Sequence, residues 1–401
     1  MMPAFMHEKA FGAMAVIFVS IWLLCGISPF VVIWLYGWSV VLMLLLRRSV
    51  PARLCCAIHA LVLGSPFLVN NNTAPAPDVP TFRMIYAFCG IYIMSRSVQV
   101  IKRRAWYRAR PPLFAYNTLV WYMLAPAHDE ETANPSGKAG DKKVALLKHR
   151  AFDGRALGEY ITWMAACLAF GAIAQAVPSS WAWSVPRNAL LGVAAMSALH
   201  VLDAFFRFTW LAAGGVSLRP IMRAPWLSRS LKEFWSERWD LFVRDMLTDL
   251  VFKPLRRQRI SQPVATLATF VASGFLHGYP IVIAGGHDAA WHATCAGVYF
   301  VVIAVLLLIE QTLAPACRAL WKRVGPASPR LKTALLRVWV LTAVSLPAGL
   351  LIEPYSTVAA RYVDARAAAS GGGSTDADAK GEGPLAIGLT LLSAAVAIWA
   401  C

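Results

Sequence analysis

The chain has 401 residues, of which 58% are hydrophobic and only 15% are charged, whereas ordinary soluble domains carry about 25% charged residues. Its apolar residues form runs too long and too numerous for one water-soluble core, which excludes a soluble globular enzyme. With 16 Trp, 19 Phe and 11 Tyr, the chain has too much buriable surface for a disordered protein. Its eight cysteines are scattered and form no Cys-x-x-Cys pair, which excludes a disulfide scaffold. The composition therefore predicts an all-α fold, a polytopic bundle of transmembrane helices.

The net charge is +17, from 38 Lys and Arg residues against 21 Asp and Glu residues. In a soluble protein this excess would indicate nucleic-acid binding. Here the basic residues cluster between apolar runs, so the positive-inside rule explains them better, and no nucleic-acid partner is expected. A basic cytosolic face would also attract an anionic substrate or anionic membrane lipids.

Ten apolar stretches approach the roughly 20 residues that a transmembrane helix needs, which predicts about nine or ten spans. The stretches are 10–25, 29–46, 54–69, 82–95, 157–177, 188–212, 263–284, 290–314, 333–352 and 384–401. No small-residue cleavage site follows the first stretch, so we expect a retained span there and not a cleaved signal peptide.

The basic loops between these spans predict which side of the membrane each loop faces. Four loops rich in Lys and Arg are expected in the cytosol: 96–112, 126–156, 213–262 and 315–332. Residues 70–80 and 354–383 are then lumenal, and the glycosylation sequon at Asn71 lies so close to the membrane that its use stays open. The short apolar stretch 113–125 is expected at the membrane interface or as a re-entrant segment. The predicted location is the endoplasmic reticulum membrane.

Polar side chains at three places fall inside predicted spans, where an ionisable residue is a functional candidate by default. His59 stands alone in an apolar run and is more simply a packed structural residue. His200, Asp203 and Arg207 are spaced to share one helical face, which favours an intramembrane ion pair over a catalytic dyad.

The third place, His277, is the strongest of these candidates. It follows the small residues 272–274, which let a neighbouring helix or a substrate approach the backbone. Gly278 and Pro280 come directly after it, and they are expected to disrupt the helix and open a pocket at this level. A neutral imidazole in such a pocket can take a proton from a hydroxyl nucleophile. Local sequence alone leaves a functional and a structural role equally open.

An amphipathic segment precedes this span. Its apolar side chains recur at helical spacing: Leu231, Trp235, Trp239, Phe242, Met246 and Leu250. Ser230 and Glu233 have the spacing of a capping box. We expect an interfacial amphipathic helix and not a span. Pro254 and a basic run end it on the cytosolic side.

Two motifs in this region resemble the wax synthase branch of the membrane-bound O-acyltransferase family. The segment SLKEFWSERWD (230–240), followed by VFKPL, resembles the family pattern SL-x-x-FW-x-x-RW, and ATFVASGFLHG (268–278) resembles its later SG-x-x-H. The region of resemblance is 228–280. The rest of the chain agrees with the family only in hydropathy and number of spans.

The resemblance implies an ester-forming acyltransferase in which His277 is the general base. Members of the family often have Asn directly after the RW pair, where this chain has Asp240. An Asn can donate a hydrogen bond to a developing oxyanion, but an ionised Asp cannot. Three alternatives follow for Asp240: it orients His277 or an arginine, it stays protonated, or the chain lacks a residue with the oxyanion-stabilising role at this position. His277 and Asp240 are the candidate catalytic residues.

The implied substrates are a fatty acyl-CoA and a long-chain alcohol, which form a wax ester and free coenzyme A at a site open to the cytosol. Six residues of the motif region are expected to bind them: Trp235, Arg238, Trp239, Lys253, Arg256 and Arg257. Acyl-CoA is a co-substrate, and no permanently bound cofactor is expected. No metal site is expected either, because His287, Asp288 and His292 are interpreted as part of a lumenal loop.

Alternatives remain open. The acceptor could be a sterol, a diacylglycerol or a terpenoid alcohol, and the chain could instead be a non-enzymatic lipid transporter or membrane scaffold. The sequence predicts no oligomeric state. The expected organisation is N-terminal transmembrane spans (1–112), an interfacial and cytosolic basic loop (113–156), a catalytic membrane core (157–353), a flexible linker (354–383) and a C-terminal span (384–401).

Overall fold

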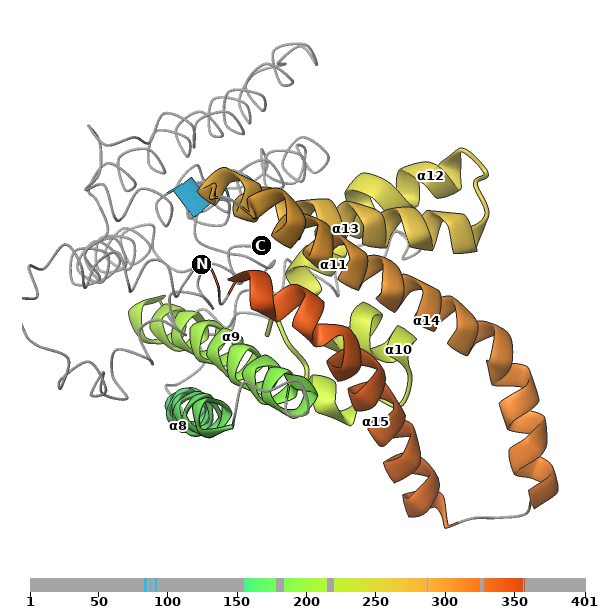
Figure 1. Cartoon of the computed structure of the whole chain (residues 1–401). Coiled ribbons are helices and arrows are strands. Elements are labelled where there is room, and N and C mark those ends of the chain that lie inside the picture. The colour runs from blue at the N-terminus through green and yellow to red at the C-terminus, as the bar shows by residue number, and fades with distance from the viewer. Residues whose placement is uncertain are drawn as a thin grey trace, which may run out of the picture. The chain divides into compact units, whose positions relative to one another are not determined.

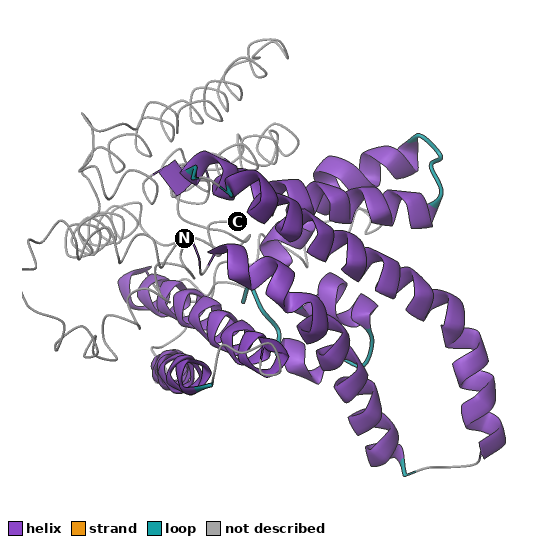
Figure 2. Ribbon diagram, in the orientation of Figure 1, coloured by secondary structure: helices purple, strands orange, loops and turns teal. Residues whose placement is uncertain are grey.

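The computed structural model describes residues 155–177, 184–214, 220–286, 288–324, 328–355 and 357, together with 83, 84, 87 and 91. Every regular element in these residues is helical, which confirms the predicted all-α class (Figure 1 and Figure 2). Several predictions lie outside the described residues: the spans 10–25, 29–46, 54–69 and 384–401, most of 82–95, His59, the loop 70–80, and the segments 96–154 and 358–383.

The chain divides into two compact units. The first comprises Met1–Val62, Ile93–Trp163 and His200–Ile221, and the second comprises Leu63–Tyr92, Met164–Leu199 and Met222–Cys401. Two helices have residues in both units: α8 (Arg155–Ala176) and α9 (Ser184–Gly214). They coincide with the predicted apolar stretches 157–177 and 188–212.

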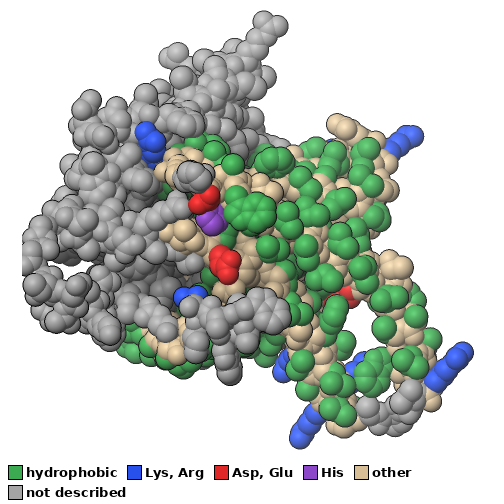
Figure 3. All heavy atoms as spheres, in the orientation of Figure 1, with side chains coloured by type: hydrophobic (Ala, Val, Ile, Leu, Met, Phe, Trp, Pro, Cys, Tyr) green, Lys and Arg blue, Asp and Glu red, His purple; other side chains and the backbone are tan. Residues whose placement is uncertain are grey.

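Three helical stretches of the second unit are long and apolar enough to cross a membrane. They are α13 (Gln262–Ala284), α14 (Ala289–Val324) and α15 (Pro329–Ser345), the last continuing through η7 (Leu346–Ala348) to Tyr355. Many large apolar side chains on these helices are exposed, as expected of a surface that faces lipid. Figure 3 shows hydrophobic side chains over α14 and α15, with Lys and Arg at the end where the two helices follow each other in the chain.

Helix α14 is longer than the sequence predicts. The basic stretch 315–332 is expected as a loop, but α14 continues through Pro315 to Val324, so Arg318, Lys322 and Arg323 are helical. A proline removes only one backbone donor from a helix. The residues after Pro315 include good helix formers such as Ala and Leu, and the helix persists.

Helices α13 and α14 lie side by side and approach closely through small residues (Figure 1). A Cβ atom added at Gly274 would lie 3.0 Å from the Gly297 Cα atom. A Cβ atom added at Gly278 would lie 3.0 Å from the Ala293 carbonyl oxygen. Both glycines therefore permit a contact between backbones that a side chain would prevent.

The expected disruption of the helix after His277 is wrong. Helix α13 continues through Gly278 and Pro280 and ends only at Ala284. Gly278 provides the close contact with α14, and one internal proline leaves the neighbouring turns helical. The space beside His277 therefore arises between helices and not from a break in α13.

The motif segment is not the single amphipathic helix that the spacing predicts. It consists of η4 (Pro225–Leu227), α10 (Leu231–Glu233), the π-helical turn η5 (Phe234–Arg238), α11 (Leu241–Leu247), the π-helical turn η6 (Thr248–Phe252) and α12 (Lys253–Arg257). The main break lies at Trp239, which is extended, and at Asp240, which has the left-handed backbone angles φ 30° and ψ 68°. Asp240 starts a new helix because its side chain caps the backbone N–H of Val243.

The predicted helix start at Ser230 is confirmed. Its Oγ atom accepts a hydrogen bond from the Glu233 N–H, with 3.0 Å between the two atoms. The Glu233 carboxylate accepts from the Arg229 N–H at 2.8 Å, one residue before the position that a capping box would use. The side chain that follows the cap, Leu231, is fully buried, so this capped turn is anchored in the core.

Candidate active site

His277 lies on α13 with its imidazole against the Phe300 ring of α14, and the two ring centroids are 4.3 Å apart. Its Nδ1 atom is 2.8 Å from the backbone carbonyl oxygen of Ser273, one turn earlier. A carbonyl can only accept, so Nδ1 carries the proton and Nε2 of the neutral ring is an acceptor. Among the described residues the ring makes no other hydrogen bond. Nε2 can therefore accept a proton from a ligand.

His277 lines a cavity of about 450 Å³ within the second unit, a size typical of small-molecule sites, which are about 300–1,000 Å³. The walls come from α9, the motif segment, α13, α14, and α15 with the residues that follow it. Three further predicted residues line the same cavity: Trp235, Trp239 and Asp240. The structure thus brings the two sequence motifs together around one space.

Trp235 connects the motif segment to the histidine helix. Its ring packs edge-on against Trp239, Phe270 and Phe300, with centroid distances of 6.0, 5.7 and 6.2 Å. Phe270 belongs to α13, and Phe300 is the ring that contacts His277. The indole Nε1 atom of Trp235 is buried and has no hydrogen-bond partner among the described residues. This donor therefore stands unpaired beside the cavity.

Asp240 lines the cavity from the break in the motif segment. One carboxylate oxygen accepts the Val243 N–H at 3.1 Å, which closes the first turn of α11. The carboxylate and the His277 ring are not hydrogen-bonded to each other. Direct orientation of His277 by Asp240 therefore has no support in this geometry, and a role for its charge stays a prediction.

Arg238 is not among the residues that line the cavity, and it holds the motif segment together. Its Nε atom lies 2.7 Å from a Glu233 carboxylate oxygen, and its Nη1 atom donates to the Arg223 carbonyl at 3.0 Å. Burial opposes the Glu233 charge, but hydrogen bonds from the Arg229 N–H and Arg238 outweigh it and lower the pKa of Glu233. Glu233 is therefore ionised at neutral pH.

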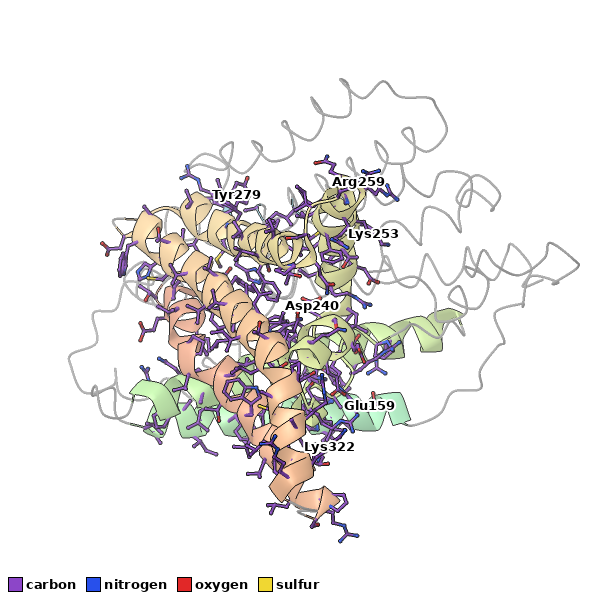
Figure 4. All side chains as sticks on the ribbon, turned by 90° about the vertical axis from the view of Figure 1, so that its right-hand side faces the viewer. Glu159, Asp240, Lys253, Arg259, Tyr279 and Lys322 are labelled. Carbon is purple, nitrogen blue, oxygen red and sulfur yellow. The ribbon has the colours of Figure 1, made fainter. Side chains whose placement is uncertain are left out.

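The predicted basic residues of α12 do not line the cavity. Lys253 pairs with Asp249 at 2.7 Å, and an Arg256 Nη atom donates to the Ile260 carbonyl at 2.6 Å. Arg257 is exposed. Figure 4 shows Lys253 with Arg259 near this end of the unit, apart from Asp240. Binding of coenzyme A by these side chains stays a prediction about the surface outside the cavity.

Two cationic side chains that the sequence analysis missed, Lys232 and Arg244, do line the cavity. With Ser236 and Asp240 they recur every fourth residue, a polar series beside the apolar stripe. Arg244 is held in place by donating from Nη1 to the Ser236 carbonyl at 2.6 Å. This regular polar spacing was the signal that could have identified them.

Glu310 of α14 is a third residue that was not predicted from the sequence. Its carboxylate accepts the Leu231 N–H, with 3.0 Å to each oxygen, and the indole N–H of Trp339 at 2.8 Å. The Leu231 amide is in the first turn of α10, where backbone donors have no partner within the helix. Glu310 therefore fixes the start of the motif segment to α14 and α15. An ionisable residue inside the predicted span 290–314 was the available signal.

The polar group predicted around Asp203 lies in the first unit and forms ion pairs. Arg207 Nε is 3.0 Å from an Asp203 oxygen, and Arg207 Nη2 is 2.6 Å from a Glu159 oxygen. The other Asp203 oxygen accepts the Ile221 N–H at 3.1 Å and does not bond to His200. The predicted pair of Asp203 and Arg207 is therefore present, and its place inside the membrane stays a prediction.

Metal-binding groups are absent from the part of the chain that the structure describes: no three His, Cys, Asp or Glu side chains there could hold one ion. His292 lies in the first turn of α14 and not in a loop, and His287 is outside the described residues.

Comparison with known proteins supports the resemblance seen in the two motifs. Residues 218–302 match the family model described as membrane bound O-acyl transferase family. The chain is 31% identical over 105 residues to probable long-chain-alcohol O-fatty-acyltransferase 2 of Arabidopsis thaliana, which is 24% of this chain and 29% of the relative. It is 27% identical over 177 residues to probable long-chain-alcohol O-fatty-acyltransferase 6 of Arabidopsis thaliana. This match covers 41% of this chain and 50% of the relative.

A third relative from Arabidopsis thaliana is named for a sterol acceptor and not for a long-chain alcohol. Acyl-CoA–sterol O-acyltransferase 1 is 30% identical over 102 residues, 23% of this chain and 30% of the relative. The chain thus spans half or less of the length of these three curated relatives. The predicted resemblance to the wax synthase branch of the membrane-bound O-acyltransferases is confirmed for the region that holds both motifs.

Proposed function

We propose that the chain is an acyl-CoA-dependent O-acyltransferase that forms wax esters from a fatty acyl-CoA and a long-chain fatty alcohol. The observation that supports this function most is the position of His277. Its Nδ1 atom is committed to the Ser273 carbonyl, while its ring lines a largely apolar cavity whose walls include three membrane-compatible helices. The matching relatives named as long-chain-alcohol acyltransferases point to the same chemistry.

In the proposed reaction Nε2 of His277 is the general base. It accepts the hydroxyl proton as the alcohol oxygen attacks the thioester carbonyl carbon. The tetrahedral intermediate collapses, the carbon–sulfur bond breaks, and the proton held on Nε2 passes to the departing thiolate. The products are an ester and free coenzyme A, and no covalent enzyme intermediate is needed. The Ser273 carbonyl stabilises the transient imidazolium by accepting from Nδ1.

Asp240 is proposed to act through its charge. A carboxylate that lines the same largely apolar cavity would favour the positive imidazolium that forms at His277, because opposite charges attract more strongly in a protein cavity than in bulk water. Its φ of 30° and its bond to the Val243 N–H hold it in place without movement during the reaction. Trp235 and Trp239 would contact the substrates from the same side.

Acyl-CoA is proposed to arrive from the cytosolic side of the endoplasmic reticulum membrane. Its phosphates would meet the exposed cations of α12, Lys253, Arg256 and Arg257, and its thioester would enter the cavity beside Lys232 and Arg244. Arg238 would support this path indirectly through the Glu233 pair. The acyl chain and the alcohol can reach the cavity from the lipid.

A panel of acceptors tests this function. Membranes that contain the chain receive labelled palmitoyl-CoA with hexadecanol, a sterol, a diacylglycerol or a terpenoid alcohol. Labelled wax ester formed from hexadecanol, and lost in membranes with His277→Gln, is the expected result. Absence of labelled ester with every acceptor would contradict the acyltransferase proposal.

A sterol is the second candidate acceptor, because one matching relative is named as an acyl-CoA–sterol O-acyltransferase. Its identity to this chain, 30%, is close to the 31% of the first long-chain-alcohol relative. Labelled steryl ester without wax ester in the same panel would replace the long-chain alcohol by a sterol and leave the role of His277 unchanged.

A further inference from the structure

One wall of the cavity differs from the rest, because α9 contributes only apolar side chains to it. The residues are Ala189, Gly192, Val193, Met196 and Leu199. Their spacing of three or four residues places them on one face of the helix. The face extends over about 15 Å at the rise of an α-helix. The stretch after α15, with Ala348, Leu351 and Ile352, also lines the cavity and is apolar.

The polar lining comes from other elements. It comprises Lys232, Ser236, Asp240, Arg244 and Thr248 of the motif segment, Gln262, Thr266, Thr269, Ser273 and His277 of α13, Tyr299 and Gln311 of α14, and Ser345 of α15. The cavity therefore has a polar lining where a thioester and a hydroxyl would react, and an apolar wall without hydrogen-bonding side chains on α9. Such a wall suits a hydrocarbon chain, whose burial is favourable and needs no polar partner.

Gly192 and Ile352 lie close to each other on this wall, and this pair is called the Gly192–Ile352 contact. A Cβ atom added at Gly192 would lie 3.3 Å from the Ile352 Cδ1 atom. Glycine in a helix interior costs about 1 kcal/mol relative to alanine, so its presence here is consistent with a need for space. Ile352 precedes by three residues Tyr355, whose hydroxyl donates to the His277 carbonyl at 2.7 Å. In sequence, the Gly192–Ile352 contact therefore lies within one helical turn of Tyr355, whose hydroxyl binds the His277 backbone.

We propose that the α9 wall binds the hydrocarbon chain of one substrate, and that Gly192 with Ile352 determines which chain lengths are accepted. This proposal rests on the proposed function for its reaction. The chain belongs to the fatty acyl group or to the long-chain alcohol, which share the same chemistry. A side chain at Gly192 would occupy space that long chains need beside Ile352, and shorter chains would still fit.

Chain-length profiles test the proposal in two arms. In the first arm, decanoyl-CoA and palmitoyl-CoA are compared at constant hexadecanol. In the second, decanol and hexadecanol are compared at constant palmitoyl-CoA. Gly192→Leu should lower kcat/KM for the long chain by about tenfold or more in one arm and leave the short chain within about threefold. The arm that responds identifies which substrate lies on the wall.

Two further variants separate selectivity from misfolding. Gly192→Ala adds only the Cβ atom and should produce a smaller shift, which Ile352→Ala in the same chain should reverse by restoring space. Gly158→Leu on α8 is the matched control, because a Cβ atom there meets nothing within 4 Å and the residue does not line the cavity. An unchanged length profile in Gly192→Leu, or an equal loss with all lengths in both Gly192 variants, would overturn the proposal.

A binding measurement makes the two proposals distinguishable. A photoreactive hexadecanol or palmitoyl-CoA should crosslink to α9 in the wild-type chain, and unlabelled long-chain substrate should compete. Gly192→Leu should reduce this crosslink relative to Gly158→Leu. Crosslinking as expected in a chain without ester synthesis would contradict only the proposed function. Ester synthesis without competable crosslinking to α9 would overturn only the chain-binding wall.

Discussion

The Tyr355 hydroxyl donates a hydrogen bond to the backbone carbonyl of His277, with 2.7 Å between the two oxygens. Tyr355 is only 2% exposed and ends the helical stretch that follows α15. The bond therefore ties a third membrane-compatible helix to the backbone of the proposed general base, about two turns before the end of α13. Pro280 lies close by and provides no backbone N–H to this part of the helix.

Tyr355→Phe removes this bond and preserves the ring. We expect a loss of stability of about 1 kcal/mol, typical of one hydrogen bond, and a several-fold lower kcat with little change in KM. The lower kcat follows because a less constrained His277 spends less time in the reactive geometry. Thermal unfolding in detergent and ester synthesis at varied substrate concentration measure the two effects. A variant with wild-type kcat would show that the bond has no part in positioning.

The close contact of α13 and α14 predicts an asymmetric response to alanine. Gly274→Ala would place a Cβ atom 3.0 Å from the Gly297 Cα atom, and backbone atoms cannot move aside as a flexible side chain can. We expect a loss of about 1–3 kcal/mol of stability and less folded protein in membranes. Gly297→Ala is the control, since its added Cβ atom meets nothing within 4 Å. Equal melting temperatures for the two variants would contradict the packing described above.

Glu310 predicts a difference between two substitutions. Glu310→Ala leaves the Leu231 amide and the Trp339 indole without their acceptor, so we expect about 1–3 kcal/mol of destabilisation for a donor left unpaired. Glu310→Gln keeps one acceptor oxygen and should recover part of the loss in both stability and ester synthesis. Thermal unfolding and activity of the two variants, at matched amounts in the membrane, test this. Identical behaviour of Ala and Gln would show that the hydrogen bonds are unimportant.

Two variants of Asp240 distinguish the effect of its charge from the effect of its helix cap on the Val243 N–H. Asn also favours left-handed backbone angles and caps helices well, so Asp240→Asn should fold normally. If the charge favours the imidazolium at His277, this variant should lose activity moderately. Asp240→Ala loses the cap as well, and we expect at least about a tenfold loss of ester synthesis. Wild-type rates in both variants, at saturating substrates, would remove Asp240 from the site.

The sequence predicts the helices of the described region well, because long apolar runs have few alternatives in a membrane. The apolar stretch 263–284 matches α13 almost residue for residue. The break at Asp240 was not predictable from periodicity, since Trp235, Trp239 and Phe242 keep helical spacing across it. Periodicity reports which side chains share a face and not whether the backbone hydrogen bonds are continuous.

The site was predicted in its centre and missed at its edges. His277 was recognisable because a histidine beside small residues is unusual in an apolar run. Arg238 and Lys253 were expected to bind substrate. They form ion pairs with Glu233 and Asp249, which are near in sequence, and substrate binding by them stays a prediction. The hydrogen bond from Tyr355 to the His277 carbonyl joins residues far apart in the chain, so no local sequence pattern predicts it.

The central claim is that Nε2 of His277 takes the proton of the acceptor alcohol. The most direct measurement is the rate of wax ester synthesis by His277→Ala and His277→Gln in membranes that contain as much protein as the wild type. We predict that both variants retain thermal stability near that of the wild type and lose about 10²–10⁴-fold in rate, the usual contribution of a general base. Near-normal rates in either variant would contradict the account, because no other imidazole lines the cavity in the part of the chain that the structure describes.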